Sequence, residues 1–488
     1  MSVEKMSRRD FLRGSALVAA SVTLAACRPS GPESEDSQAE ETAAEGSIAE
    51  PGTTDSTEGA APAPEPVTIV AKAWPGSPFE TESITAAIAK FEEESPDIKV
   101  DWQTEPQAYA EKVLTQIAAG TPPDTMYASA DDFFSWVSQD VLLDITAFVD
   151  EDGELGEPEY WTNYDEEIAR CTWEGRWYGL GSCWVAPHLY TNLDLLEAAG
   201  VEPPSNDPSE AWTWEEFLDA ANALTLDSSG KHPGEDGFDP SDIEQHGVQW
   251  PTTMLFLGAA LGSNGGESTA PAPDGRFLVD SPEAMEAIQA VADLATVHHV
   301  APQGAFFEEI GMNNLEALGS GKLAMIVDGS WSLMRMQPLR EQFTLGTAVL
   351  PKMKAPYTVI LAHNQAMSAD GQQKEATWKF VRFLSGDFYQ KALCAGGLWL
   401  PNHASLGTPE AIASWINPEV HTDGYEKVAL DYVVEAGHTM FQAPGFVEAS
   451  AMISSALDEV WIGNAQVVDV LPDAVAEANA VIEEWATE

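Results

Sequence analysis

Apolar and polar residues follow two alternating patterns in this chain, one typical of buried strands and one typical of amphipathic helices. Val67–Trp74 (VTIVAKAW) predicts a first strand that ends in an aromatic residue, and Leu323–Val327 (LAMIV) is a continuous apolar run, as expected for a strand buried on both faces. Thr81–Glu94 instead spaces its apolar residues along one helical face. The alternation continues through residues 98–149 and predicts a doubly wound α/β lobe.

Local signals mark turns and element starts farther along the chain. Thr172–Leu180 (TWEGRWYGL) predicts a hairpin with a two-residue Glu-Gly turn. Thr213 and Glu216 have the spacing of a capping box before an amphipathic run. Phe343–Pro351 (FTLGTAVLP) predicts a strand that returns the chain across a hinge.

The segment Leu315–Met336 combines a helix end, the LAMIV strand and a large aromatic residue. Gly319 and Gly321 can take the positive φ that ends a helix. The sequence DGSW, ending in Trp331, follows at the carboxyl end of the strand, where ligands bind in open α/β sheets, and Ser332 is placed to cap a following helix. An indole face complements the C–H face of a sugar ring, so Trp331 is a candidate ligand-binding residue; the competing interpretation is that it fills the core.

Composition narrows the class of protein. The chain has 488 residues, of which 44% are hydrophobic, so it is long enough and apolar enough for two lobes with a core. Its net charge of −56 argues against binding nucleic acid, because phosphates would be repelled. No run of about 18 apolar residues follows the first thirty residues, so we expect no later transmembrane helix. Sixteen tryptophans are compatible with an aromatic-lined sugar site.

The N-terminus has the features of an exported lipoprotein. Ser7–Arg13 (SRRDFLR) matches the twin-arginine pattern, and an apolar run then leads to LAAC at Leu24–Cys27, which resembles a lipobox. We therefore predict a signal peptide at residues 1–26 and lipidation of Cys27. Residues 27–66 are rich in Ser, Glu, Ala, Pro and Gly and predict a disordered acidic tether. The expected location is extracytoplasmic, with the protein anchored to the cell membrane through its lipid.

The order of these segments resembles the family 1 extracellular solute-binding proteins of ABC importers, the sugar-binding group that includes maltose-binding protein. The resemblance covers nearly all of residues 67–400, and its motifs are GTPPDT at Gly120–Thr125, EGRWYGL, LYTNLDLL at Leu189–Leu196, TWEEFLDAANALT, GKLAMIVDGSW and ATWKFVRFLSG at Ala376–Gly386. Two features depart from the family. Asn192-Leu193-Asp194 replaces the usual Asn-Lys-Asp, and the loop at residues 227–246 has no obvious counterpart.

The resemblance implies an α/β, two-lobed periplasmic-binding-protein-like fold of type II, with a hinge between the lobes and the ligand in the cleft. Lobe 1 would comprise residues 67–184 and 347–395, and lobe 2 residues 185–346 and 396–488. It further implies a monomer that captures a sugar or oligosaccharide and delivers it to the transmembrane subunits of an ABC permease. No cofactor and no catalysis are expected.

Candidate ligand-binding residues follow from the same comparison and from positions at strand ends. By resemblance, Asp131 would hold sugar hydroxyls, although it is also suited to cap a helix; Asp132 stands where the family sometimes has Arg. Other candidates are residues at strand ends and crossing points: Trp74, Trp184, Trp250, Trp399, and Asn364 with its neighbour His363. The competing interpretations are core packing for each tryptophan and a surface position for Asn364 and His363.

Other chemistries find little support in the sequence. No HExxH, EF-hand or GxSxG pattern occurs, so neither a metal site nor a serine nucleophile is predicted. Cys171 and Cys183 are out of register for a cross-strand disulfide, and the sequence leaves open whether any bridge forms among Cys171, Cys183 and Cys394. Two alternatives remain: a binding protein for a polyamine or peptide, favoured if acidic side chains point into the cleft, and a carbohydrate-active enzyme, which would need two carboxylates across it.

Overall fold

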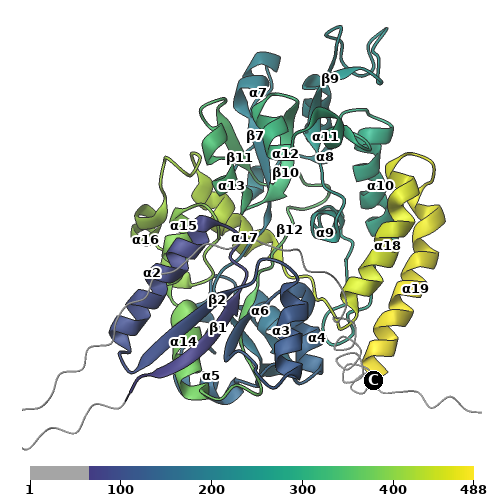
Figure 1. The fold of residues 1–488 in the computed structure, drawn as a ribbon. Helices are drawn as coiled ribbons and strands as arrows, with labels where there is room; N and C mark the ends of the chain where they lie inside the picture. The colour runs from purple at the N-terminus through teal and green to yellow at the C-terminus, as the bar shows by residue number, and fades with distance from the viewer. Residues whose placement is uncertain (1–64, 488) are drawn as a thin grey trace, which may run out of the picture.

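Two five-stranded sheets organise the computed structural model, which describes residues 65–487 (Figure 1). The predicted signal peptide, tether and lipidated Cys27 lie outside the described residues. The sheets occupy separate lobes, one below the other in Figure 1. The expected two-lobed α/β fold is therefore confirmed.

The first sheet combines strands from the beginning of the domain with one strand from far along the chain. Its order is β2 (Ile98–Thr104), β1 (Val67–Ala73), β3 (Thr125–Ala128), β13 (Asn364–Met367) and β6 (Gly179–Gly181). β1 is parallel to β2 and β3, whereas β13 is antiparallel to β3 and β6. The helices associated with these strands are α2 (Pro78–Glu94), α3 (Tyr109–Ala118), α4 (Ala130–Ser138), α5 (Thr146–Asp152), α6 (Tyr164–Cys171), α14 (Lys374–Leu384) and α15 (Asp387–Ala395).

The second sheet is built around the buried LAMIV strand. Its order is β11 (Leu345–Ala348), β7 (Pro187–Asn192), β10 (Leu323–Gly329), β9 (Ile243–Gln249) and β8 (Leu226–Asp227). β10 is parallel to β9 and antiparallel to β7. The associated helices are α7 (Leu193–Ala199), α8 (Trp214–Ala223), α9 (Met254–Ser263), α10 (Pro282–Thr296), α11 (Phe306–Ile310), α12 (Asn314–Gly319) and α13 (Ser332–Arg335).

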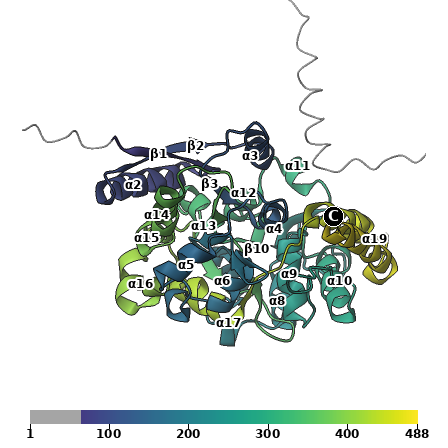
Figure 2. The same cartoon turned by 90° about the horizontal axis from the view of Figure 1, so that it is seen from below.

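The segments that link the two sheets run side by side between the lobes. The Trp184 N–H donates to the Leu400 carbonyl, and the Val185 N–H donates to the Leu361 carbonyl, both at 2.8 Å. Near them, the short strands β12 (Thr358–Val359) and β14 (Gly437–His438) pair in parallel. The remaining helices are α16 (Pro409–Trp415), α17 (Tyr432–Ala436), α18 (Phe446–Trp461) and α19 (Val467–Thr487); the last two form a pair along one side of the molecule (Figures 1 and 2).

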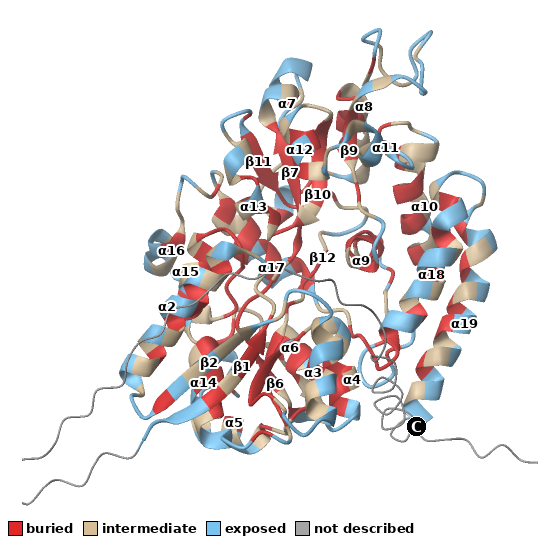
Figure 3. Ribbon diagram, viewed as in Figure 1, coloured by how far each residue is buried: buried red, intermediate tan, exposed pale blue. Residues whose placement is uncertain are grey.

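Burial follows the hydrophobic pattern. The strands are largely buried, and the helices expose their outer faces (Figure 3). All five residues of Leu323–Val327 are 0% exposed, which confirms a strand covered on both faces. Among residues 65–487, no helix is both long and apolar enough to cross a membrane.

The local predictions have mixed outcomes. The hairpin is confirmed as β4 (Thr172–Trp173) and β5 (Arg176–Trp177), and both turn residues have positive φ, 50° and 75°, as a type I′ turn requires. It is shorter than expected, because Gly179–Gly181 joins the first sheet. The predicted Ser332 cap is wrong: Trp331 occupies the N-cap of α13 without a side-chain hydrogen bond, and Ser332 lies in the first turn. Gly321 has positive φ, whereas Gly319 is still helical.

The predicted capping box of α8 is present. The Thr213 hydroxyl accepts from the Glu216 N–H, and the Glu216 carboxylate accepts from the Thr213 N–H at 2.8 Å. Replacing Thr213 by Ala should therefore lower the free energy of unfolding by about 1 kcal/mol, measured by urea denaturation. Thr213→Ser keeps the acceptor and serves as the control; equal losses in both variants would contradict the capping role.

Candidate ligand-binding site

Aromatic side chains gather at the edge of the first sheet where its parallel strands end. Trp74 directly follows β1, and Tyr127 lies next to the last residue of β3. His363 precedes β13, whose first residue, Asn364, pairs with Ala128 at the end of β3. Because β13 and β3 are antiparallel, the start of one and the end of the other share an edge. This is the edge at which open α/β sheets bind ligands.

The rings of this aromatic cluster (Trp74, Tyr109, Tyr127, His363 and Trp399) are in mutual contact. The Trp74 centroid lies 4.5 Å from that of Tyr109 and 5.4 Å from that of Tyr127. His363 stacks on Tyr127 at 3.9 Å and lies 5.0 Å from Trp399. Burial, and secondarily the charge of Arg170, lowers the pKa of His363 to about 3, so this ring is neutral near pH 7. Trp74, Tyr109 and His363 are half-buried, whereas Tyr127 and Trp399 are buried, so the first three form the accessible part of the cluster.

Trp331 approaches the same region from the second sheet. It is half-buried and packs against the apolar cluster that contains Trp399. Gly329 makes this position available, because a Cβ there would lie 2.2 Å from the indole ring. Nearby, the Ser77 hydroxyl after β1 is 3.9 Å from the Met334 sulfur in α13. Trp331 of the second lobe therefore packs against the apolar cluster of the first lobe that contains Trp399.

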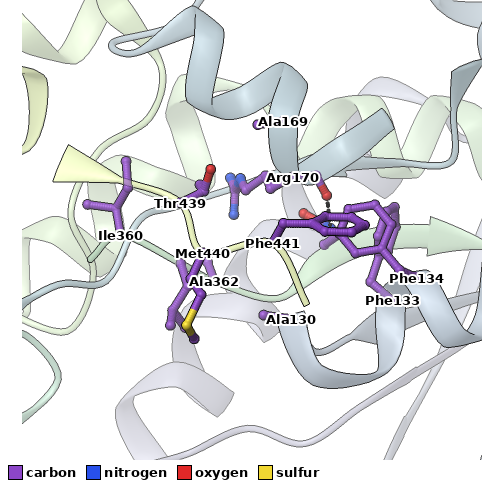
Figure 4. A pocket seen from close by; sticks show the side chains of 12 residues that line it. Ala130, Phe133, Phe134, Ala169, Arg170, Ile360, Ala362, Thr439, Met440 and Phe441 are labelled. Carbon is purple, nitrogen blue, oxygen red and sulfur yellow. Dashed lines mark hydrogen bonds between the residues drawn. The ribbon is translucent and has the colours of Figure 1, made fainter. Parts of the chain in front are cut away.

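A small cavity lies beside the linking segments (Figure 4). It is enclosed by α4, by Ala169 and Arg170 of α6, and by segments 360–364 and 439–441. Its volume is about 20 Å³. A cavity of this size holds about one water molecule, so a sugar ring would not fit in this conformation.

Arg170 is the charged side chain at this cavity. Its Nε and Nη2 donate to the Glu167 carboxylate at 2.9 and 2.8 Å. Its guanidinium carbon lies 3.9 Å from the centroid of the Trp184 ring, in cation–π geometry. Nη1 is buried and has no hydrogen-bond partner within residues 65–487, and Figure 4 shows the guanidinium pointing toward Thr439. Its position suits a ligand or water oxygen that accepts a hydrogen bond.

Asp131 lies in the first turn of α4 and follows Ala130, which lines the cavity. Ser129, not Asp131, caps this helix, because its hydroxyl accepts from the Asp132 N–H. Desolvation and the charge of Asp132 raise the pKa of Asp131, and a hydrogen bond from Gln442 opposes the rise. The Gln442 Oε1 is buried and accepts no hydrogen bond in the described part of the chain. The competing interpretation of Asp131 as a helix cap is therefore wrong.

Comparison with known proteins identifies the family. Residues 78–391, more than half of the chain, match the family model described as "Bacterial extracellular solute-binding protein". The chain belongs to this family. Residues 5–25 of the solute-binding protein match the model of the twin-arginine translocation pathway signal sequence, which confirms that prediction. The family membership and the signal together indicate an extracytoplasmic location.

Several known proteins match this chain over most of its length. A Brucella abortus (strain 2308) protein with the name "Putative binding protein" is 23% identical over 398 residues, covering 80% of this chain and 88% of its own. An ABC substrate-binding protein from Listeria monocytogenes, in complex with cycloalternan, has a TM-score of 0.70 and 22% identity, covering 86% of this chain and all of its own. The GacH receptor of Streptomyces glaucescens has a TM-score of 0.67 and 18% identity, covering 86% and 100%. At these identities the structural likeness establishes the fold alone.

The remaining candidates of the solute-binding protein lie in different surroundings. Trp184 is 0% exposed, enclosed beside Arg170. Asn364 is 2% exposed, and its amide donates to the Arg170 carbonyl while its Oδ1 accepts from the Cys171 thiol. Trp250 follows β9 of the second sheet, with its ring centroid 5.6 Å from that of Trp214, outside the aromatic cluster. Trp74, Trp399 and His363 are thus brought together, and Trp331 packs against the apolar cluster that contains Trp399. Asn364 lines the cavity, whereas Asp131 follows the lining residue Ala130, and Trp250 lies apart from them.

Several residues of this region were not singled out from the sequence. Tyr109 and Tyr127 belong to the aromatic cluster, and Arg170 and Gln442 present unpaired polar atoms. Tyr127 could have been found, because it lies near the end of a strand and shortly before Asp131. No local sequence pattern marked Arg170 or Gln442 as a site residue, because the residues around them come from distant segments of the chain.

The His, Cys, Asp and Glu side chains of the described residues are the ones that could bind a metal ion or, for cysteine, form a disulfide. Within residues 65–487, no group of three or more His, Cys, Asp or Glu side chains is arranged to hold a metal ion. Cys171, Cys183 and Cys394 are buried free thiols, so none of the disulfides left open by the sequence is present among them.

Proposed function

We propose that this chain is the substrate-binding component of an ABC importer and that it captures a sugar or oligosaccharide between its two lobes. The solute would then be delivered to the transmembrane subunits of a permease, with lipidated Cys27 holding the monomer at the outer face of the membrane. Lobe 1 would comprise residues 67–184 and 349–395, and lobe 2 residues 185–348 and 396–488; the boundary expected at residue 347 moves, because β11 (Leu345–Ala348) belongs to the second sheet.

One observation carries this proposal: aromatic side chains gather at the carboxyl edge of the parallel strands of the first sheet, and Trp331 of the second lobe packs against the apolar cluster that contains one of them, Trp399. Trp74 comes from lobe 1 and Trp331 from lobe 2, and Trp399, in the segment after α15, contacts His363 beside Trp74. Flat apolar faces suit the C–H faces of a pyranose, whose hydroxyls need polar partners at the rim. Asp131 and the unpaired Arg170 Nη1 supply an acceptor and a donor for such hydroxyls. Solute-binding proteins that resemble this chain are described in complex with cycloalternan, acarbose and maltotetraose.

Binding would require the lobes to separate and close again. The cavity of about 20 Å³ is too small for a ring, and the Ser77–Met334 contact spans the two lobes. A solute that makes more contacts in the closed form would shift the population toward closure. The closed form would be the one that docks on the permease.

A saccharide should raise the melting temperature of the protein by mass action, because it binds only the folded state. We expect a hit among mono- and oligosaccharides in a thermal-shift screen, and a loss of about tenfold or more in affinity, by calorimetry, in Trp331→Ala and Trp74→Ala. Trp378→Ala is the control, since Trp378 is also half-buried but stacks on Phe148 in lobe 1. No shift with any saccharide would contradict the proposal.

A cationic solute such as a polyamine is a second candidate, favoured by the two carboxylates in the first turn of α4, Asp131 and Asp132. Desolvation raises the pKa of both Asp131 and Asp132, and neither forms an ion pair with any of the described residues. A cation placed beside them would relieve that cost. A shift with spermidine, abolished in Asp131→Asn, would favour this candidate, and a saccharide shift without one would exclude it.

A further inference from the structure

The imidazole of His363 is held in one orientation within the aromatic cluster. Its face stacks on Tyr127 with the ring planes 17° apart, and the rings of Trp74 and Trp399 meet it at 73° and 61°. The side chain is half-buried, so it is neither sealed in the core nor free to turn in solvent. Each polar atom of this ring therefore keeps a fixed direction at the candidate site.

Gln365 decides which nitrogen of this ring carries the proton. Its Nε2 lies 3.4 Å from the His363 Nε2 and 3.1 Å from the Ser182 Oγ. An amide nitrogen can only donate, so the His363 Nε2 must accept. Burial lowers the pKa of His363 to about 3, which leaves the ring neutral near pH 7. A neutral imidazole has a single N–H, and in His363 this N–H is therefore at Nδ1.

The Nδ1–H of His363 is a donor without a partner. Its ring makes one hydrogen bond to the described residues, through Nε2. The unpaired ring nitrogens that are sealed from solvent in this part of the chain belong to His188 and His246, not to His363. The Nδ1–H therefore stays within reach of a solute, beside the accessible Trp74.

A free donor favours a solute that offers an oxygen. The hydroxyl and ring oxygens of a neutral sugar accept hydrogen bonds, whereas the protonated amines of a polyamine can only donate. A carboxylate also accepts, but the net charge of −56 disfavours an anionic solute. Of these solute classes, the neutral sugar is the one that fits the donor.

We propose that the His363 Nδ1–H donates a hydrogen bond to an oxygen of the bound solute and so selects a neutral, hydroxylated solute over a polyamine. The inference rests on the proposed function and deepens it, because it chooses between the two solute classes that remain there. His363 would contribute to specificity through the proton on one ring nitrogen, and Gln365 would act as the residue that positions this proton.

NMR signals of the ring nitrogens, recorded on the full chain labelled at its histidines, test the position of the proton at pH 7. Overhauser contacts with the Tyr127 ring identify the signals of His363, so this measurement needs no variant. We expect a protonated Nδ1 and an unprotonated Nε2. A protonated Nε2 would overturn the inference, whether or not the protein binds a sugar.

Titration calorimetry with maltotetraose and with spermidine tests the contact with the solute. His363→Phe keeps a flat ring beside Tyr127 but removes the N–H, so its affinity for maltotetraose should fall by about tenfold. We expect no binding of spermidine by the wild-type protein. His403→Phe is the matched control, since His403 also packs on a tyrosine ring, that of Tyr160 at 4.3 Å, outside the aromatic cluster. Its affinity for maltotetraose should equal that of the wild type.

The outcomes separate this inference from the proposed function. Equal affinities of His363→Phe and the wild type for maltotetraose overturn the inference, even if Trp331→Ala loses binding and so upholds the proposed function. Binding of spermidine in place of maltotetraose overturns the selection of a neutral solute. If the thermal-shift screen identifies a different saccharide, that saccharide replaces maltotetraose in the titrations. A screen without any saccharide hit overturns the inference and the proposed function together.

Discussion

Replacing Glu167 by Gln is expected to lower the free energy of unfolding by about 3–5 kcal/mol, the largest effect of any single substitution considered for this protein. Glu167 is 0% exposed and Arg170 only 7%, so the ion pair is buried. The Glu167 carboxylate also accepts from the Gly181 N–H at 2.9 Å and from the Asn402 amide at 3.2 Å. The neutral amide of the Glu167→Gln variant would leave the Arg170 charge buried without its counter-charge.

Urea denaturation measures this loss, with Glu92→Gln as the control. Glu92 and Lys99 are 2.7 Å apart, but the Lys99 side chain is 50% exposed, so losing that pair should cost about 1 kcal/mol or less. The double variant Glu167→Gln/Arg170→Met should recover much of the stability, because it removes both charges. Equal, small losses in Glu167→Gln and Glu92→Gln would contradict the importance of burial.

The fold could be predicted from the sequence wherever a pattern is local. The LAMIV run became β10, the Glu-Gly turn became a hairpin, and Thr213 with Glu216 formed a capping box. Ser332 failed as a cap because the chain turns into α13 at Trp331, whose φ and ψ of −60° and −17° are already helical. A hydroxyl before an apolar run can supply the acceptor for a cap, but it does not specify the backbone angles that capping requires.

The site was only partly predictable, because its members come from distant segments. Trp74 and Trp399 were recognised singly, by position, yet their common contact with His363 depends on how β1, β13 and the loop after α15 meet. The role of Asp131 could not be separated from helix capping until Ser129 was seen to cap α4. Trp250 carried the same signal as Trp74, a tryptophan after a strand, but its strand belongs to the other sheet.

Glu80 should make the stability of this protein fall as the pH rises from about 4.5 to about 7. This residue is 5% exposed, in the first turn of α2, and desolvation raises the pKa of its carboxyl from 4.5 to about 7. One oxygen accepts from the Gly76 N–H at 2.7 Å, which opposes the rise without cancelling it. Between these pH values the folded state keeps a proton that the unfolded chain releases, so folding loses stability with increasing pH.

Glu80→Gln should therefore be more stable than the wild type by up to about 3 kcal/mol at pH 8, and equally stable at pH 4, where the carboxyl is protonated in both states. The amide keeps an acceptor for the Gly76 N–H and removes only the ionisation. Differences in the free energy of unfolding between variant and wild type cancel the background of the other acidic residues. Glu82→Gln, at an exposed position of the same helix, should change that free energy by about 0.5 kcal/mol or less. A Glu80→Gln gain of the same size at both pH values would show that the substitution acts through packing, not through the buried charge.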